Sequence, residues 1–315
     1  MREKKVNIMD IKQAIVPIYE KLYTSEIVMS ITYRYNNRLH RLNIMDSEKT
    51  IKYILERKCS AARFGEGEFE LILHPDRDLG FQKHDERLAE RLESVFDNDN
   101  ENLLVCLPYA LNSIYGRTKH SMYFWTYWGN HDNQHHRIVE LIRNHLRGGG
   151  VFGDTQLTRP YIAYKTPLHG EKMFPQLKKL WQDKAILFVE GEKTRCGVGN
   201  DLFDNAASIK RILCPSTNAF NRLDSIITAV KDSWKGELIL LALGPTATVL
   251  AAEFADMGMQ ALDIGHLDIE YEWFLNGAKS HDVVSGKFTN EARGGDLVSD
   301  CEDTAYLNQI ICRIE

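Results

Sequence analysis

From Cys59 onward, short apolar runs alternate with longer segments in which apolar residues recur every three or four positions. The short runs have the length of buried strands, and the longer segments have the period of amphipathic helices. Strands that alternate with helices of this length build βαβ units and therefore a mainly parallel sheet. We predict a Rossmann-like α/β fold with strands at 60–65, 102–107, 148–153, 185–191, 209–215, 237–244 and 259–265, and with helices that include 85–96, 132–146, 219–234 and 246–258.

Three stretches of the chain differ in pattern. Residues 1–46 form a helical extension, with apolar residues at helical spacing over 8–23. Residues 47–280 form the α/β domain, which opens with a second predicted helix at 47–58. Residues 281–315 are polar and contain several glycines, so we expect a loop and a short final helix packed on the domain.

Composition excludes several classes of protein. The net charge is −5 in 315 residues, so no basic field would attract nucleic acid. The six cysteines contain no CxxC pair, which argues against a structural zinc site and a disulfide framework. The first ten residues lack the apolar stretch of a signal peptide, and no apolar run is long enough to span a bilayer. We expect a cytoplasmic protein.

Polar or glycine-rich loops follow five of the predicted strands. In open α/β sheets, ligands bind outside the carboxyl ends of the strands. Five such loops at one edge exceed what a purely structural sheet needs, so a ligand site is predicted there. The loops contain Gly65 to Glu68, Asp154 to Arg159, Glu192 to Gly199, Pro245 to Thr248, and His266 with Asp268.

The first of these loops suggests a cation site. Glu66 and Glu68 are separated by a glycine, and in extended or turn backbone both carboxylates could approach one cation. His266 could complete the set of ligands, since imidazole favours Mn²⁺ over Mg²⁺. A solvated pair of surface glutamates is the alternative interpretation.

Two further loops suggest a diphosphate site. Lys193 and Arg195 precede a Gly-x-Gly turn that includes Gly199, and such cations beside exposed amides suit phosphate oxygens. Thr246 or Thr248 opens a predicted helix. Either threonine could simply cap that helix, or the helix amides could bind a phosphate. Together the two loops fit a nucleotide diphosphate held with a metal.

Three other segments each have two interpretations. The basic and aromatic segment 33–42 is a solvated helix face, or a surface that contacts a membrane or an acceptor. His131 and His135 lie four apart, either on a helix surface or as metal ligands. The aromatic segment 121–130 packs in the core or forms a sugar-stacking wall, with Tyr127 and Trp128 as its exposed members.

Four stretches resemble the glycosyltransferases of GT-D fold, a family first catalogued as a domain of unknown function. The resemblance covers roughly residues 47–279, in the expected order. The stretches are RFGEGEF (63–69), FGDTQLTRPY (152–161), VEGEKTRCGVGNDLFDNAASIKRILCPSTNAF (189–220) and LGPTATVLAAEFADMGMQALDIGHLDIEYEWFL (243–275).

This resemblance implies a metal-assisted enzyme that transfers a sugar, typically glucose, from a UDP-sugar to a glycan or glycoprotein. In the best-known members the acceptor is a bacterial serine-rich surface adhesin. The family's metal motif is Asp-x-Glu, whereas this chain has Glu66-Gly67-Glu68. The longer first side chain could still reach a metal if the loop retreats, with a changed metal preference or affinity. By the resemblance, Glu66, Glu68 and His266 form the metal cluster, and Asp154, Arg159, Lys193 and Asn200 are donor-site candidates. The predicted donor site also includes Arg63, Gly65, Arg195, Gly199 and Thr246.

If the reaction inverts the sugar's configuration, a carboxylate must take the proton of the acceptor hydroxyl. Asp268 is the first candidate, followed by Glu270 and Glu272; a retaining reaction would need no such base. The main alternative is a non-catalytic module that binds a nucleotide-sugar or a glycan on the same fold. A Rossmann-like methyltransferase is disfavoured, because no glycine-rich first turn with an acidic residue one strand later is present.

Overall fold

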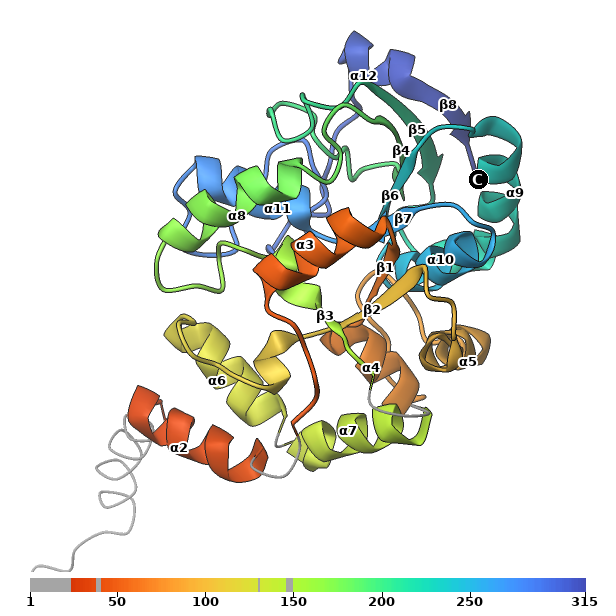
Figure 1. The fold of residues 1–315 in the computed structure, drawn as a ribbon. Helices are drawn as coiled ribbons and strands as arrows, with labels where there is room; N and C mark the ends of the chain where they lie inside the picture. The colour runs from red at the N-terminus through yellow and green to blue at the C-terminus, as the bar shows by residue number, and fades with distance from the viewer. Residues whose placement is uncertain (1–23, 38–40, 130, 146–149) are drawn as a thin grey trace, which may run out of the picture.

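The structure is a computed structural model that describes residues 24–37, 41–129, 131–145 and 150–315. Within these residues, eight strands form one parallel sheet in the order β3-β2-β1-β7-β6-β4-β5-β8 (Figure 1). Each predicted strand range overlaps a strand, although the third does so only at Gly153. The strands are β1 (Ser60–Arg63), β2 (Leu103–Leu107), β3 (Gly153–Asp154), β4 (Ala185–Gly191), β5 (Ser208–Cys214), β6 (Leu238–Ala242), β7 (Ala261–Asp263) and β8 (Ile310–Arg313).

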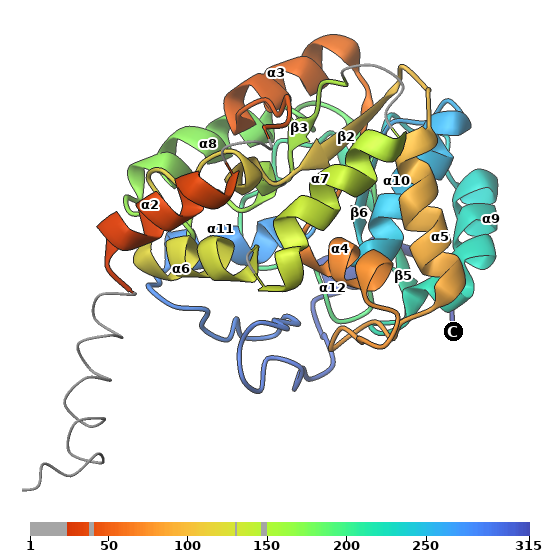
Figure 2. The ribbon, with the colours of Figure 1, turned by 90° about the horizontal axis from the view of Figure 1, so that it is seen from below.

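Helices cover both faces of this sheet (Figures 1 and 2). One face carries α4 (Glu66–Leu73), α5 (Glu86–Ser94), α6 (Lys119–Trp128), α7 (Gln134–His145), α9 (Leu223–Ser233) and α10 (Pro245–Asp256). The other face carries α3 (Ser47–Arg57), α8 (Leu168–Lys178) and α11 (Leu267–Leu275). Outside these layers, α2 (Glu26–Asn37) packs against α6, and α12 (Thr304–Gln309) precedes β8. Short 3₁₀ turns are η1 (Val95–Asp97), η2 (Tyr109–Leu111), η3 (His131–Asn133), η4 (Thr155–Thr158) and η5 (Ala219–Arg222).

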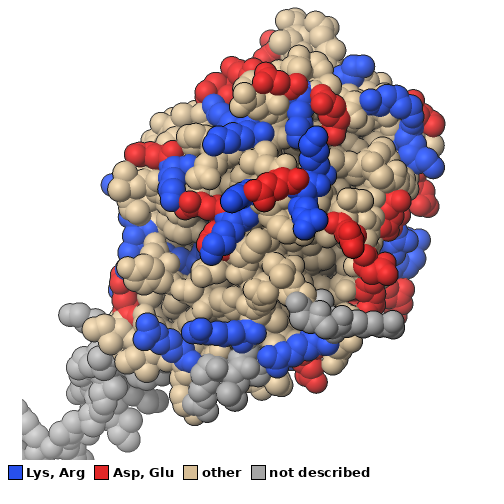
Figure 3. All heavy atoms as spheres, in the orientation of Figure 1, with Lys and Arg blue, Asp and Glu red and all other residues tan. Residues whose placement is uncertain are grey.

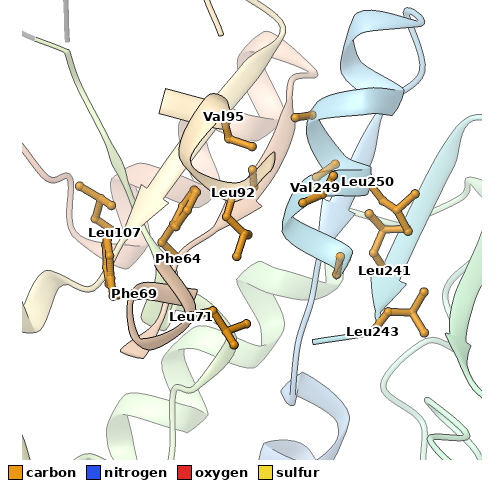
Figure 4. Packing of buried hydrophobic residues seen from close by; sticks show 14 of the residues in the cluster. Phe64, Phe69, Leu71, Leu92, Val95, Leu107, Leu241, Leu243, Val249 and Leu250 are labelled. Carbon is orange, nitrogen blue, oxygen red and sulfur yellow. The ribbon is translucent and has the colours of Figure 1, made fainter. Parts of the chain in front are cut away.

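Two apolar layers result from the alternation of side chains along each strand. In β4, Leu187 and Val189 belong to the layer under α10, whereas Ile186 and Phe188 belong to the layer under α8. Burial on both faces explains why the central strands are apolar runs without polar alternation. Figure 4 shows part of the first layer, where Phe64 and neighbouring side chains from α4 and α5 meet those of β6 and α10.

The structure corrects the sequence analysis at three places. Glu66, Gly67 and Glu68 form the first turn of α4, where extended or turn backbone was predicted, because Gly65 serves as the N-cap directly after β1. Asp268 lies in the first turn of α11 and not at the strand end. Residues 310–313 form β8, which pairs with β5 and adds an edge strand to the sheet where only a short helix was expected.

Other predictions are confirmed or lie outside the described residues. The helix predicted at 47–58 is α3, with the Asp46 side chain as its cap. The helix predicted at 8–23 and residues 38–40 of the basic segment lie outside the described residues. Among the described helices, none has both the length and the apolar character needed to cross a membrane.

Candidate functional site

A pocket lies at the carboxyl ends of β4, β5, β6 and β7. The strand connections run in opposite directions from this point of the sheet. The chain passes from β4 to its neighbour β5 toward one edge, and from β6 to its neighbour β7 toward the other edge. Such a switch point is where open α/β sheets bind their ligands. Gly191, Gly244 and Gly265 line the pocket. The polar side chains that line it are Gln82, Thr194, Ser216, Asn218, His266, Asp268 and Asn290.

Helix α10 begins at this pocket. Gly244, the residue before the helix, has φ +55°, and a Cβ there would lie 2.3 Å from the Phe81 ring, so the position requires glycine. The positive end of the helix dipole therefore faces the pocket. Thr246 is fully buried, and its Oγ1 has no hydrogen-bond partner within the described part of the chain. Neither threonine caps the helix, since Thr248 Oγ1 donates to the carbonyl oxygen of Arg63 at 2.8 Å.

The loop after β4 is fixed by the C-terminal strap, which we define as residues 281–299. The Arg195 guanidinium donates to the carbonyl oxygens of Gly286, at 2.9 Å, and Ser299, at 2.6 Å. Lys193 contributes its own carbonyl oxygen, which accepts the Phe288 amide at 2.9 Å. Gly199, with φ +83°, is exposed. Arg195 thus holds the strap in this conformation, whereas the sequence suggested a phosphate contact.

A second set of contacts joins the same loop to α11. Asp268 Oδ1 accepts the Gly197 amide at 2.9 Å and Asn200 Nδ2 at 2.8 Å, and Asn200 also donates to Glu272 Oε1 at 2.7 Å. Lys287, from the strap, lies between the two carboxylates, 2.7 Å from Asp268 Oδ2 and 2.8 Å from Glu272 Oε1. Asp268 and Lys287 are both buried. The carboxylate at the pocket wall is therefore held in place by two backbone segments.

Glu270 is fully buried beside the pocket wall and does not line the pocket. Its Oε2 accepts the amides of Tyr161 and Ile162, each at 3.0 Å, and its Oε1 faces Arg159 Nε at 3.4 Å. Burial raises the pKa of this carboxyl above its ordinary value. Glu270 thus anchors the 159–162 segment.

Arg159 forms a two-pronged ion pair with Glu291 of the strap. Both terminal guanidinium nitrogens lie 2.6 Å from a Glu291 oxygen. Burial opposes ionisation of Glu291, but the charge of Arg159 outweighs it and lowers the pKa of Glu291 to about 2. His281 Nε2 lies 3.4 Å from the same carboxylate. Arg159 is therefore neutralised by protein carboxylates in this conformation.

The three proposed metal ligands lie at the ends of neighbouring strands, because β1 and β7 pair through Ala61 and Leu262. Glu68 Oε2 accepts the Gly65 amide at 2.6 Å, and burial raises the pKa of Glu68 to about 7. His266 Nε2 lies 2.5 Å from Asn290 Oδ1, and burial lowers the pKa of this imidazole, which favours its neutral form. Within the described ranges, no three His, Cys, Asp or Glu side chains are arranged as metal ligands.

Arg63 and Asp154 do not line the pocket; they lie at the ends of β1 and β3. Arg63 Nη1 lies 3.1 Å from Asp263 Oδ1, and a Cβ on Gly265 (φ +46°) would come within 2.3 Å of the same nitrogen. Asp154 accepts the Ser47 hydroxyl at 2.6 Å and also accepts the amides of Tyr109 and Gln156. Both side chains are buried. Their contacts are with protein groups, so in this conformation they hold the segments at these strand ends in place.

The family model for glycosyltransferases of the GT-D fold matches residues 61–292. The chain belongs to the GT-D glycosyltransferase family. It is 40% identical over 279 residues to the probable glycosyl transferase Gly of Streptococcus gordonii. This match covers 87% of this chain and 39% of that protein. It is 36% identical over 274 residues to glycosyltransferase GlyD of Streptococcus pneumoniae. This second match covers 87% of this chain and 33% of that protein.

A solved structure, a new glycosyltransferase from Streptococcus sanguinis, superposes with a TM-score of 0.79 and 37% identity. This match covers 87% of the GT-D chain and all of that structure. The fold predicted from the sequence is confirmed. The chain spans about two fifths and one third of the two curated relatives' lengths.

Sequence reasoning missed the contribution of the strap to this GT-D site. Phe288 and Asn290 line the pocket, Lys287 neutralises two carboxylates of α11, and Glu291 pairs with Arg159. The sequence around these residues has no apolar period and was interpreted as a loop or tail. A lysine and a glutamate among glycines carry no local signal, because their partners are distant in the chain.

The remaining motifs have mainly structural contacts. His135 is buried in α7, and its Nε2 lies 3.1 Å from the Leu111 carbonyl oxygen. Trp128 donates to Glu70 Oε1 at 2.9 Å and so joins α6 to α4. Tyr123 and Tyr127, one helical turn apart on α6, have ring centroids 4.7 Å apart. The described part of the aromatic segment, residues 121–129, is therefore partly core and partly an outer face of α6.

Proposed function

We propose that this chain transfers glucose from a UDP-sugar to a hydroxyl group of a glycan or glycoprotein, with the help of a divalent cation. Membership of the GT-D family supports transfer of a sugar. The observation that carries the proposal is the pocket at the β4–β6 switch point, where the start of α10 meets His266 and Asp268. Such a pocket can hold a nucleotide diphosphate and present its sugar to an acceptor.

The start of α10 would bind the diphosphate. Its dipole favours a group with negative charge, and Gly244, which lines the pocket, lets that group approach the backbone closely. Thr246 sits in the same helical turn, but it is fully buried and does not line the pocket. The same helix end would stabilise the charge that develops on the departing UDP.

The cation, Mn²⁺ in preference to Mg²⁺, would be held by Glu66, Glu68 and His266. The donor set suits Mn²⁺, since it combines two carboxylates with an imidazole. The position fits as well, because Glu66 opens α4 after β1 and His266 follows the neighbouring strand β7. Binding would require Glu68 to release the Gly65 amide, because the three groups do not converge in this conformation. When bound, the ion would neutralise charge on the diphosphate.

Asp268 is the best placed of the three predicted bases. It lines the pocket, whereas Glu270 and Glu272 do not. In an inverting reaction Asp268 would accept the proton of the attacking hydroxyl while Lys287 and Asn200 fix its orientation. In a retaining reaction Asp268 would remain the anchor that joins α11 to the strap.

The test is UDP release from a panel of UDP-sugars, with and without Mn²⁺ and with a glycan acceptor. We expect release to be fastest with UDP-glucose and to depend on the cation. Stabilisation of the folded chain by UDP without any release would favour the alternative, a module that binds nucleotide-sugars without catalysis. If UDP does not stabilise the chain and no UDP-sugar releases UDP, both functions are contradicted.

A further inference from the structure

Helix α2 is apolar on two opposite faces. Met29 and Tyr33 are buried against the body of the protein. Ile27, Ile31 and Tyr35 recur every four residues and share the outer face, with 73%, 63% and 63% of their surface exposed. A helix on a protein surface normally carries polar residues on its outer face. The outer face of α2 therefore resembles one that contacts a partner.

Two further exposed rings belong to segments linked to α2. Tyr123 of α6, the helix that packs against α2, is 44% exposed. Tyr115, before α6, is 93% exposed and adjoins Gly116, whose carbonyl oxygen accepts the Lys165 amide. The Lys165 ammonium in turn pairs with Glu26, which begins α2. We call the set Ile27, Ile31, Tyr35, Tyr115 and Tyr123 the α2 patch. Apolar patches of this kind on a soluble protein usually mark an interaction surface.

The margin of the α2 patch is basic. The chain has 44 acidic residues, yet none occurs between Ile27 and Met45 or between Asn102 and His131. Arg34, on the outer face of α2 itself, is exposed, as are Arg41 and Lys119. In Figure 3 the charged side chains along the lower margin of the molecule, where α2 and α6 lie, are more often Lys or Arg than Asp or Glu. The local charge is thus opposite in sign to the net charge of −5.

We propose that the α2 patch docks this protein on an anionic lipid surface. A helix with isoleucines on one face, flanked by tyrosines and basic residues, fits the boundary between lipid headgroups and acyl chains. The basic margin matches the charge of anionic headgroups. A second copy fits less well, because a twofold contact would bring the same arginines and lysines together. The contact lies in the plane of the surface and spans no bilayer.

This surface would also place the candidate site beside the lipid. His120, at the start of α6, has its ring centroid 6.1 Å from that of His281 in the strap. Phe288 and Asn290, further along the same strap, line the pocket. An acceptor held at a membrane would therefore lie on the side of the molecule where the strap closes the site. The proposal itself rests on α2 and does not depend on transferase activity.

The test is co-sedimentation of the full chain with two kinds of vesicle. One contains equal parts of phosphatidylglycerol and phosphatidylcholine, and the other contains phosphatidylcholine alone. We expect binding to the first, weaker binding at high salt, and little binding to the second. The double variant Ile27→Ser with Ile31→Ser should bind at least about tenfold more weakly. Arg34→Glu should also weaken binding.

The matched control is Leu297→Ser, which removes a side chain that is 84% exposed in the strap. It should bind vesicles as the unmodified chain does, and circular dichroism should show that every variant remains folded. Absence of vesicle binding, or equal loss in the control and the double variant, would overturn the proposal. A dimer that the double variant abolishes, seen by light scattering without any lipid binding, would assign the patch to a second copy instead.

Discussion

Lys287 Nζ lies 2.7 Å from Asp268 Oδ2 and 2.8 Å from Glu272 Oε1, so one buried cation of the strap neutralises two carboxylates one turn apart on α11. Burial alone would lower the pKa of Lys287, but the charge of Asp268 and the hydrogen bonds to both carboxylates raise it. This contact latches the strap onto the helix that carries Asp268 into the pocket wall.

Lys287→Met should strongly destabilise the folded chain. The substitution leaves Asp268 buried without its cation, and removal of one partner from a buried ion pair costs about 3–5 kcal/mol. Urea unfolding followed by tryptophan fluorescence measures the loss. Lys279→Met, at an exposed position of the same region, serves as the control and should change stability by less than about 0.5 kcal/mol. Equal losses in the two variants would contradict the latch.

Asp268→Asn and Glu270→Gln should separate a pocket residue from an anchoring residue. Glu270 binds two backbone amides away from the pocket, so Glu270→Gln should cost about 1–3 kcal/mol of stability and leave kcat of the folded enzyme within about threefold. Asp268 lines the pocket, so Asp268→Asn should lower kcat by about two orders of magnitude. UDP release and urea unfolding give the two quantities. A large loss of kcat in Glu270→Gln, with a nearly unchanged kcat in Asp268→Asn, would assign the base to Glu270.

Much of the fold could be predicted because its signals are local. Each central strand is a buried apolar run, and helices such as α5 and α9 have apolar residues at helical spacing along one face. β8 could not be predicted in the same way. It has four residues, and it becomes a strand because β5 offers it an edge, a partner about 100 positions away.

The site was predictable to the level of the sheet edge but not to the level of contacts. The rule for strand ends singled out His266 and Asp268, and both line the pocket. It could not show that Arg195 would bond to Gly286 and Ser299, or that Glu270 would bind the amides of residues 161 and 162. Those partners are set by the tertiary fold, which brings distant backbone groups to side chains without a sequence signal.

Glu68→Ala and His266→Ala should each reduce cation-dependent turnover of a UDP-sugar by at least about two orders of magnitude, since charge on the leaving diphosphate would no longer be neutralised. Titration with Mn²⁺ during the UDP-release assay separates loss of affinity from loss of rate. Glu192→Ala, an exposed residue of the loop after β4, is the control and should behave as the unmodified chain does. Near-normal rates in both variants would reject the assignment of the metal ligands.

His145 should make the stability of the chain depend on pH. At the end of α7, its two ring nitrogens lie 2.9 Å from Asp97 Oδ2 and 2.9 Å from Glu93 Oε1. Burial disfavours the charged ring, but the hydrogen bonds to Asp97 and Glu93 outweigh it and raise the pKa above 6.5. Both nitrogens can donate only in the charged form. The stabilisation is therefore complete below pH 6.5 and is lost as pH rises through the raised pKa.

We accordingly expect His145→Gln to cost about 1 kcal/mol at pH 5.5 and much less at pH 9, as measured by urea unfolding at the two pH values. His136→Gln is the matched control on the same helix, because His136 faces Glu140 at 3.9 Å with both side chains exposed. Its effect should stay within a few tenths of a kcal/mol at both pH values. A loss for His145→Gln that is the same at both pH values would show that the ring contributes packing and not charge.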